Sequence, residues 1–156
     1  MEQLMKLETE TKVAEIELIY KSIVKASERP QINKAEDAYD LFLSYWDKNK
    51  IDFVEQFKLM LLNRAKRVLG IYELSTGGVA GTVADPKLIF TAALKANASY
   101  LIISHNHPSG NLAPSQADQT LTAKIAEGGK YLDLPVIDHL IVSSDGFYSF
   151  ANEGLL

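Results

Sequence analysis

Residues Tyr100 to Asp118 read YLIISHNHPSGNLAPSQAD, and this stretch holds the densest group of potential metal ligands in the chain. The apolar run at its start predicts a buried strand, and the Pro-Ser-Gly sequence after the histidines turns the chain. His105 and His107 are separated by one residue, so at the end of a strand both imidazoles face the same side of the sheet. The pattern places two metal-binding side chains together.

Asp118 is the third candidate ligand, because the helix expected to begin at Ser115 places it in the first helical turn. Two imidazoles and one carboxylate suit a catalytic Zn²⁺ that keeps its fourth position for water. A simpler interpretation stays open. A histidine at a sheet edge is often just a polar residue, and Ser115-x-x-Asp118 is also the pattern of a helix capping box. The chain contains no Cys, so no thiolate site competes.

The spacing of these residues resembles the JAMM signature of the MPN/JAB metallohydrolases, His-x-His followed by seven residues, Ser, two residues and Asp. The segments HNHPSG and PSQAD, followed by Asp138-His139, are similar to the bacterial RadC-type branch of that superfamily. The resemblance runs from about residue 51 to residue 156, and more loosely from residue 13. It implies one Zn²⁺ per chain, held by His105, His107 and Asp118.

The resemblance also implies the architecture and the domain organisation. The JAB/MPN domain is an α/β fold akin to the cytidine-deaminase-like architecture. RadC-type proteins often carry a helix-hairpin-helix module ahead of this domain. We expect residues 1–156 to form a single RadC-type JAB/MPN domain without that module, with residues 1–12 as a frayed N-terminal segment.

Hydrophobic periodicity and turn residues independently predict a mixed β-sheet flanked by helices. The expected strands are 13–23 (with a helix as the alternative), 51–62, 68–74, 100–104, 134–143 and 147–150. Helices are expected from a cap at Asn33, from Asp85-Pro86, and over 115–127 with an end at Gly128-Gly129. The segment 63–67 (NRAKR) reads as a hairpin turn, and 75–82 (STGGVAGT) as a flexible loop near the site that lacks phosphate-binding spacing.

Hydrolysis of an amide also needs a proton shuttle. Zn²⁺ lowers the pKa of a bound water towards neutrality, and a carboxylate must take the water proton and pass it to the leaving amine. Glu55 shares a predicted strand face with apolar residues, and a buried carboxylate needs a partner or a catalytic task. In JAMM enzymes the catalytic Glu begins the strand after the first helix, and VEQFKLMLL matches that context. We therefore assign Glu55 as the shuttle, with Glu73 as the alternative.

The remaining polar residues are given supporting roles. By resemblance, Ser115 would hydrogen-bond the developing oxyanion or orient the water, and its role as a helix N-cap is an equal and compatible alternative. Asp138 and His139 are expected to orient a ligand rather than to bind the metal. Asn106 and Ser109 are expected to shape the loop.

Composition limits the classes of partner. The 156 residues carry a net charge of −4, which gives no electrostatic reason to expect a polyanion. We therefore expect DNA binding to be weak and salt-sensitive at most. Tight duplex binding near physiological salt that maps to Arg64, Lys66 and Arg67 would favour a DNA-repair function instead. The sequence has no apolar run long enough to span a bilayer and no signal-peptide core, and with its lack of Cys this favours the cytoplasm.

Three functions remain in view. The first is a zinc-dependent peptidase or isopeptidase that cuts a peptide or a protein conjugate. The second is a DNA-repair-associated RadC-like protein that acts by binding DNA or repair proteins. The third is a non-catalytic MPN-type binding module, and the intact ligand set counts against it. The oligomeric state and the substrate are not determined by the sequence.

Overall fold

The fold is built on one five-stranded mixed sheet. The structure, a computed structural model, describes residues 13–78 and 83–156. The strands lie in the order β2-β1-β3-β4-β5, with β3 and β4 parallel and the other neighbouring pairs antiparallel. Their bounds are β1 Gln56–Leu62, β2 Val68–Thr76, β3 Tyr100–Asn106, β4 Val136–Ser143 and β5 Gly146–Ser149. The predicted α/β fold with a mixed sheet is confirmed.

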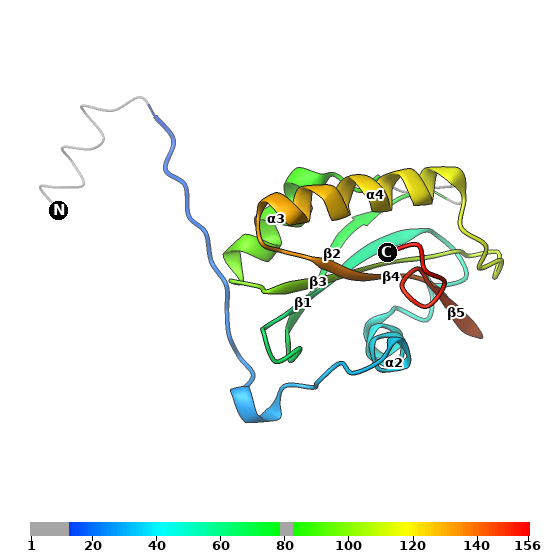
Figure 1. Cartoon of the computed structure of the whole chain (residues 1–156), viewed down its shortest axis with the longest axis horizontal. Helices are drawn as coiled ribbons and strands as arrows, with labels where there is room; N and C mark the ends of the chain where they lie inside the picture. The colour runs from blue at the N-terminus through cyan, green and yellow to red at the C-terminus, as the bar shows by residue number, and fades with distance from the viewer. Residues whose placement is uncertain (1–12, 79–82) are drawn as a thin grey trace, which may run out of the picture.

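Helices cover both faces of this sheet. Helix α2 (Ala35–Tyr45) lies against one face, whereas α3 (Pro86–Lys95) and α4 (Gln116–Tyr131) lie against the other (Figure 1). A short 3₁₀ helix, η1 (Ala26–Glu28), precedes α2. Within the described residues, no helix has the length and apolar character needed to cross a membrane.

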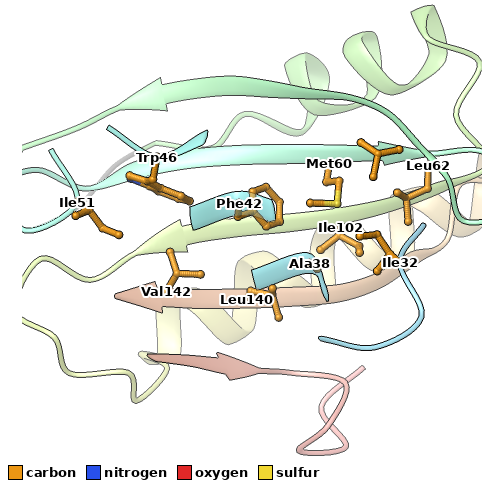
Figure 2. Close-up of a cluster of buried hydrophobic side chains, with 11 residues drawn as sticks. Ile32, Ala38, Phe42, Trp46, Ile51, Met60, Leu62, Ile102, Leu140 and Val142 are labelled. Atoms are coloured by element: carbon orange, nitrogen blue, oxygen red, sulfur yellow. The ribbon is translucent and has the colours of Figure 1, made fainter. Parts of the chain in front are cut away.

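Each face of the sheet has its own apolar core. On the α2 face, Phe42 packs against Met60 of β1, Ile102 of β3 and Leu140 of β4 (Figure 2). The α3–α4 face has a second cluster, which includes Leu59, Ile89, Ile103 and Ile125. Because β1 and β3 are central strands covered on both faces, their apolar residues are continuous rather than alternating with polar ones.

The first predicted strand is wrong. Residues 13–23 belong to none of the five strands, and Val13 and Ile16 are 80% and 82% exposed. Alternation produces a strand only where a neighbouring strand pairs its backbone groups, and this segment lies outside the sheet. Tyr20 is its main anchor, packing against the core on the α3–α4 face and donating its hydroxyl proton to the Leu69 carbonyl at 2.7 Å.

Several element boundaries differ from the prediction. Strand β2 extends to Thr76, into the segment predicted as a loop, β3 extends to Asn106, β4 begins at Val136, and β5 is shifted by one residue. Helix α2 begins at Ala35, because Asp37, rather than Asn33, closes its first turn by accepting the backbone N–H groups of Asn33 and Lys34 at 2.8 and 3.1 Å. Strand β1 begins at Gln56, because residues 51–54 form a turn instead of a strand. The NRAKR hairpin turn joins β1 and β2 as predicted. Residues 1–12 and 79–82, and the predictions made for them, lie outside the described residues.

Helix α4 continues through Gly128-Gly129 to Tyr131, so the glycines do not end it as predicted. Gly129 is required by a close approach of the chain. Its carbonyl accepts the Leu134 N–H at 2.8 Å, and a Cβ added at Gly129 would overlap the Leu134 carbonyl oxygen. The absence of a side chain at Gly129 therefore allows the chain between α4 and β4 to pass directly against the end of α4.

Gly129→Ala should destabilise the protein. Ala normally stabilises a helix interior by about 0.5–1 kcal/mol relative to Gly, but here forced backbone movement should cost about 1–3 kcal/mol. At about 2–4 °C per kcal/mol for a chain of this size, thermal unfolding should show a Tm several degrees lower. Gly70→Ala is the control, because nothing lies within 4 Å of the added Cβ; its Tm should not fall. Equal stability of Gly129→Ala and wild type would contradict this role.

Candidate metal centre

His105 and His107 project from the end of β3 towards a common point. His105 lies within β3, is 2% exposed and stacks on Phe57 of β1 with ring centroids 5.9 Å apart. His107 follows the strand, and its Nδ1 lies 2.5 Å from the Asn111 carbonyl. A carbonyl only accepts, so Nδ1 of His107 carries a proton and Nε2 is the nitrogen that faces the other candidate ligands. The two Nε2 atoms are 3.0 Å apart.

Asp118 is aimed at the same point by the start of α4. Ser115 is the N-cap: its Oγ accepts the Asp118 N–H at 3.1 Å, and its own N–H donates to Asp118 Oδ2 at 2.7 Å. This capping box leaves Asp118 Oδ1 3.2 Å from His105 Nε2, and Oδ2 lies 3.6 Å from His107 Nε2. The cap thereby fixes a carboxylate opposite both imidazoles.

The three side chains fit a tetrahedral metal ion. Ligand bonds of about 2.0–2.1 Å place two ligands of a tetrahedral Zn²⁺ about 3.3 Å apart. The closest approaches among the three residues, 3.0, 3.2 and 3.6 Å, bracket that value, and the candidate ligand atoms all lie within 4.8 Å of one another. His105, His107 and Asp118 could therefore hold a metal ion, as the sequence predicted.

The electrostatics of the cluster favour a cation. Burial alone would raise the pKa of Asp118, but hydrogen bonds from His105 and His107 hold that pKa well below its usual value. The hydrogen bond to Asp118 raises the pKa of His107 against the opposing effect of burial. A charged carboxylate therefore faces the two imidazoles across the neutral pH range.

Glu55 lies beside this cluster, directly before β1. Its N–H donates to the Gly78 carbonyl at 3.2 Å, and its carbonyl accepts the Gly77 N–H at 2.8 Å. Burial raises the pKa of the Glu55 carboxyl, and the charges of His105 and His107 lower it in part. These interactions place a half-buried carboxylate within electrostatic range of the candidate metal ligands.

Asn106 connects the Glu55 segment to the ligand strand. Its Oδ1 accepts the Gln56 N–H at 2.7 Å, and its Nδ2 donates to the carbonyls of Ile51 and Val54 at 2.7 and 2.8 Å. The sequence predicted only that Asn106 would shape its own loop. Because it lies between the two histidines on the opposite face of the strand, it ties the turn before Glu55 to them. Alternation along β3 was the signal that could have revealed this role.

His139 supports the cluster from β4. Its ring is fully buried, with Nε2 2.8 Å from His105 Nδ1 and Nδ1 2.6 Å from the Thr122 hydroxyl. Burial, followed by the charge of His105, lowers the pKa of His139 well below its usual value. The ring also stacks on Phe150. Thr122 carried no recognisable signal in the sequence.

Asp138 faces the other side of the sheet. It accepts the Ser149 hydroxyl at 2.7 Å and the Ala151 N–H at 3.0 Å. Burial raises its pKa, and these hydrogen bonds lower it in part. Asp138 therefore orders the chain after β5 and does not touch the candidate ligands.

Glu73 is also directed away from the cluster. It lies opposite Lys58 in the β1–β2 pairing and accepts a hydrogen bond from the Lys58 ammonium at 3.0 Å. That bond lowers the pKa of Glu73. Lys58 in turn lies 4.9 Å from the ring centroid of Trp46, at the end of α2, so this ion pair belongs to the α2 face. Of the two candidate proton shuttles, Glu55 is therefore the one that lies near His105 and His107.

The three cations of the NRAKR hairpin lie at the opposite end of β1. Phe57, at the start of that strand, pairs with His105, whereas the hairpin follows Leu62 at its other end. The Arg67 guanidinium donates a hydrogen bond to the Arg29 carbonyl at 2.8 Å. This loop is therefore separate from the metal-ligand cluster.

Comparison with known proteins identifies one family. The model of the RadC-like JAB domain family matches residues 32–155. A UPF0758 protein of Flavobacterium johnsoniae is 39% identical over 143 residues, covering 86% of this chain and 62% of the relative. A UPF0758 protein of Thermosynechococcus vestitus is 46% identical over 95 residues, covering 61% of this chain and 38% of the relative. UPF0758 protein YfjY of Escherichia coli is 39% identical over 102 residues, covering 65% of this chain and 64% of the relative. The chain spans less than two thirds of each of these relatives.

Asp118→Ala should abolish high-affinity zinc binding, because it leaves two imidazoles and removes the only charged ligand. Wild-type protein should bind about one Zn²⁺ per chain and melt at higher temperature with zinc, since a ligand of the folded state stabilises it. Titration with a chromophoric chelator and thermal melts measure both effects. Asp40→Ala, which removes an exposed carboxylate of α2, is the control and should bind zinc normally. Unchanged zinc affinity in Asp118→Ala would refute the ligand assignment.

Proposed function

The chain belongs to the RadC-like JAB domain family, and from this membership and the geometry of its site we propose that it is a zinc-dependent hydrolase of JAMM type. Its reaction is the cleavage of a peptide or isopeptide amide bond. The observation that carries the proposal is the convergence of His105 Nε2, His107 Nε2 and the Asp118 carboxylate, with Glu55 beside them. A purely structural cluster would have no need for the adjacent half-buried carboxylate.

Each residue has a chemical role in this proposal. His105, His107 and Asp118 would hold the metal, which when bound supplies Lewis acidity that polarises a carbonyl and acidifies a water molecule. Glu55 accepts the proton of the attacking water and delivers it to the leaving nitrogen. Its raised pKa suits this exchange, because a carboxyl group with a pKa closer to neutrality gives the proton back more readily.

Ser115 combines two tasks in this scheme. Its hydroxyl oxygen already accepts the Asp118 N–H, so its own O–H proton is free to donate to a substrate oxygen. A donor at that position would stabilise the negative charge that develops on the carbonyl oxygen in the transition state. The N-cap geometry supports this role by fixing the Ser115 side chain beside the ligand Asp118.

Amide bonds suit the proposed residues because their hydrolysis needs carbonyl polarisation, deprotonation of water and protonation of an amine. The substrate would be a peptide or a protein conjugate. The ligand set is intact, which favours a catalytic domain over a binding module that has lost its metal. DNA binding gains no support, since the hairpin cations are remote from the site and the net charge is −4.

Glu55→Gln should remove turnover but keep zinc. The amide has nearly the same shape and cannot shuttle a proton, so activity should fall about 10²–10⁴-fold, while zinc content and Tm stay close to wild type. The assay uses zinc-loaded protein and a panel of fluorogenic peptides and lysine-linked isopeptides.

Glu73→Gln is the matched control, because the same substitution is made on the opposite face of the sheet. It should keep turnover and lose at most some stability with the Lys58 ion pair. If Glu55→Gln were fully active and Glu73→Gln inactive, the proton shuttle would have been assigned to the wrong carboxylate. If the whole panel stayed uncut by wild type at the level of Asp118→Ala, the hydrolase proposal would fail.

A further inference from the structure

We propose that Asn106 is the positioning residue of the proton shuttle: its side chain holds the segment that ends in Glu55 against the strand that carries His105 and His107. Asn106 points to the face of β3 opposite the two histidines, so it acts on the reaction through Glu55 and not by contact with metal or substrate. The inference rests on the proposed function, because the catalytic role of Glu55 belongs to that proposal. The positioning itself is a property of the folded chain and can be measured without metal or substrate.

The pairing of β1 with β3 brings the two segments together but stops short of Glu55. The outermost pair of this antiparallel register is Phe57 with His105. Glu55 lies two residues before Phe57, and His107 lies two residues after His105, so continuation of the register places them next to each other. Their charges accordingly influence each other. A different interaction must hold the chain beyond the last backbone pair.

The Asn106 side chain supplies that interaction. It is fully buried, and three hydrogen bonds join it to the backbone on either side of Glu55. Its Oδ1 accepts the Gln56 N–H at 2.7 Å. Its Nδ2 donates to the carbonyls of Ile51 and Val54 at 2.7 and 2.8 Å, which uses both of its protons. One side chain of the ligand strand thus holds both the turn before Glu55 and the residue after it.

The chemistry of the partners fixes the orientation of this amide. A backbone N–H only donates and a backbone carbonyl only accepts. If the amide were turned over, Nδ2 would meet the Gln56 N–H and Oδ1 would meet two carbonyl oxygens, so all three contacts would become repulsive. The network is therefore the same whatever the protonation of the neighbouring histidines.

The backbone bonds of Glu55 itself lead to the end of β2 and not to the ligand strand. Its N–H donates to the Gly78 carbonyl at 3.2 Å, and its carbonyl accepts the Gly77 N–H at 2.8 Å. Glycines restrict the backbone less than other residues and bring no side chain to pack. Asn106 therefore sets the position of Glu55 relative to the candidate metal ligands. In such a site a displacement of about 1 Å can lower the rate about 10²-fold.

Asn106→Ala should lower turnover without releasing the metal. With zinc-loaded protein and the peptide and isopeptide panel, kcat should fall about 10–10²-fold, while KM and zinc affinity stay close to wild type. Added to Glu55→Gln, the same substitution should cause no further loss, because residues that act as a unit are not additive. A side chain that only stabilises the fold would leave kcat unchanged below the melting temperature.

Asn63→Ala is the matched control. Asn63 holds the turn at the other end of β1 in the same way, its Oδ1 accepting the N–H groups of Ala65 and Arg67 at 3.0 Å each. Its removal should lower the melting temperature and leave kcat at the wild-type value.

Amide hydrogen exchange of the metal-free protein tests the positioning itself. In Asn106→Ala, exchange at the Glu55 N–H should quicken about tenfold or more, although the substitution does not touch the bond of this N–H to Gly78. Exchange at Leu59 and Leu61, in the centre of β1, should change much less, which separates local opening from global unfolding. Asn63→Ala should leave exchange at Glu55 unchanged.

The outcomes separate the two proposals. Unchanged exchange at Glu55 in Asn106→Ala overturns the positioning role, as does a loss of turnover that is equally large in the wild-type and Glu55→Gln backgrounds. If wild type cut no substrate, the hydrolase proposal would fail and exchange at Glu55 would still decide what Asn106 holds. If Asn106→Ala failed to fold, wild type would decide: Asn106 side-chain amide protons that exchange as slowly as the Leu59 N–H support the role, and rapid exchange overturns it.

Discussion

A buried imidazole has two nitrogens, and each needs a partner of the correct kind. His105 is 2% exposed at the end of a central strand, so neither nitrogen can rely on solvent. One nitrogen meets His139, and the other meets His107 and Asp118. Neighbouring elements supply a polar partner for each nitrogen of the His105 ring, and the same contacts bring the atoms of His105, His107 and Asp118 together at a point where a cation could fit.

The sheet makes this arrangement possible because β3 is paired on both sides. Its antiparallel neighbour β1 brings Phe57 onto the His105 ring and leaves Glu55 just beyond the strand end. Its parallel neighbour β4 brings His139 from the other side. Helix α4 then closes the site with Asp118 in its first turn and Thr122 one turn later. Covering helices on both faces keep these polar contacts away from bulk water.

The sequence was most informative where the ligands lie close together along the chain. A strand, a turn and a helix cap are local features, so His105, His107, Asp118 and the Ser115 cap could be predicted from spacing alone. The boundary errors have local causes too: the 13–23 alternation lacked a strand to pair with, and the glycines of α4 serve a close approach of the chain rather than a helix end.

The side of the sheet on which Asp138 and His139 lie depends on the register between β3 and β4, which cannot be read from the sequence. Leu101 pairs with Val136, but Ile102 pairs with Asp138, so the β3–β4 register shifts by one residue. Without that shift, Asp138 would share the face of Ile103 and His139 would face α2, because successive residues alternate between faces. A similar shift between Phe57 and Lys58 sets Glu73 opposite Lys58 and away from the histidines. Such irregularities arise from packing between distant segments.

X-ray absorption spectroscopy at the zinc edge, on protein loaded with one equivalent of Zn²⁺, tests the central claim most directly. The account predicts four nitrogen or oxygen neighbours at about 2.0–2.1 Å, with outer-shell scattering from two imidazoles and no sulfur. Scattering from a single imidazole, or a six-coordinate oxygen shell, would show that zinc binds elsewhere. Three imidazoles would show that His139 is itself a ligand, and would contradict the supporting role assigned to it.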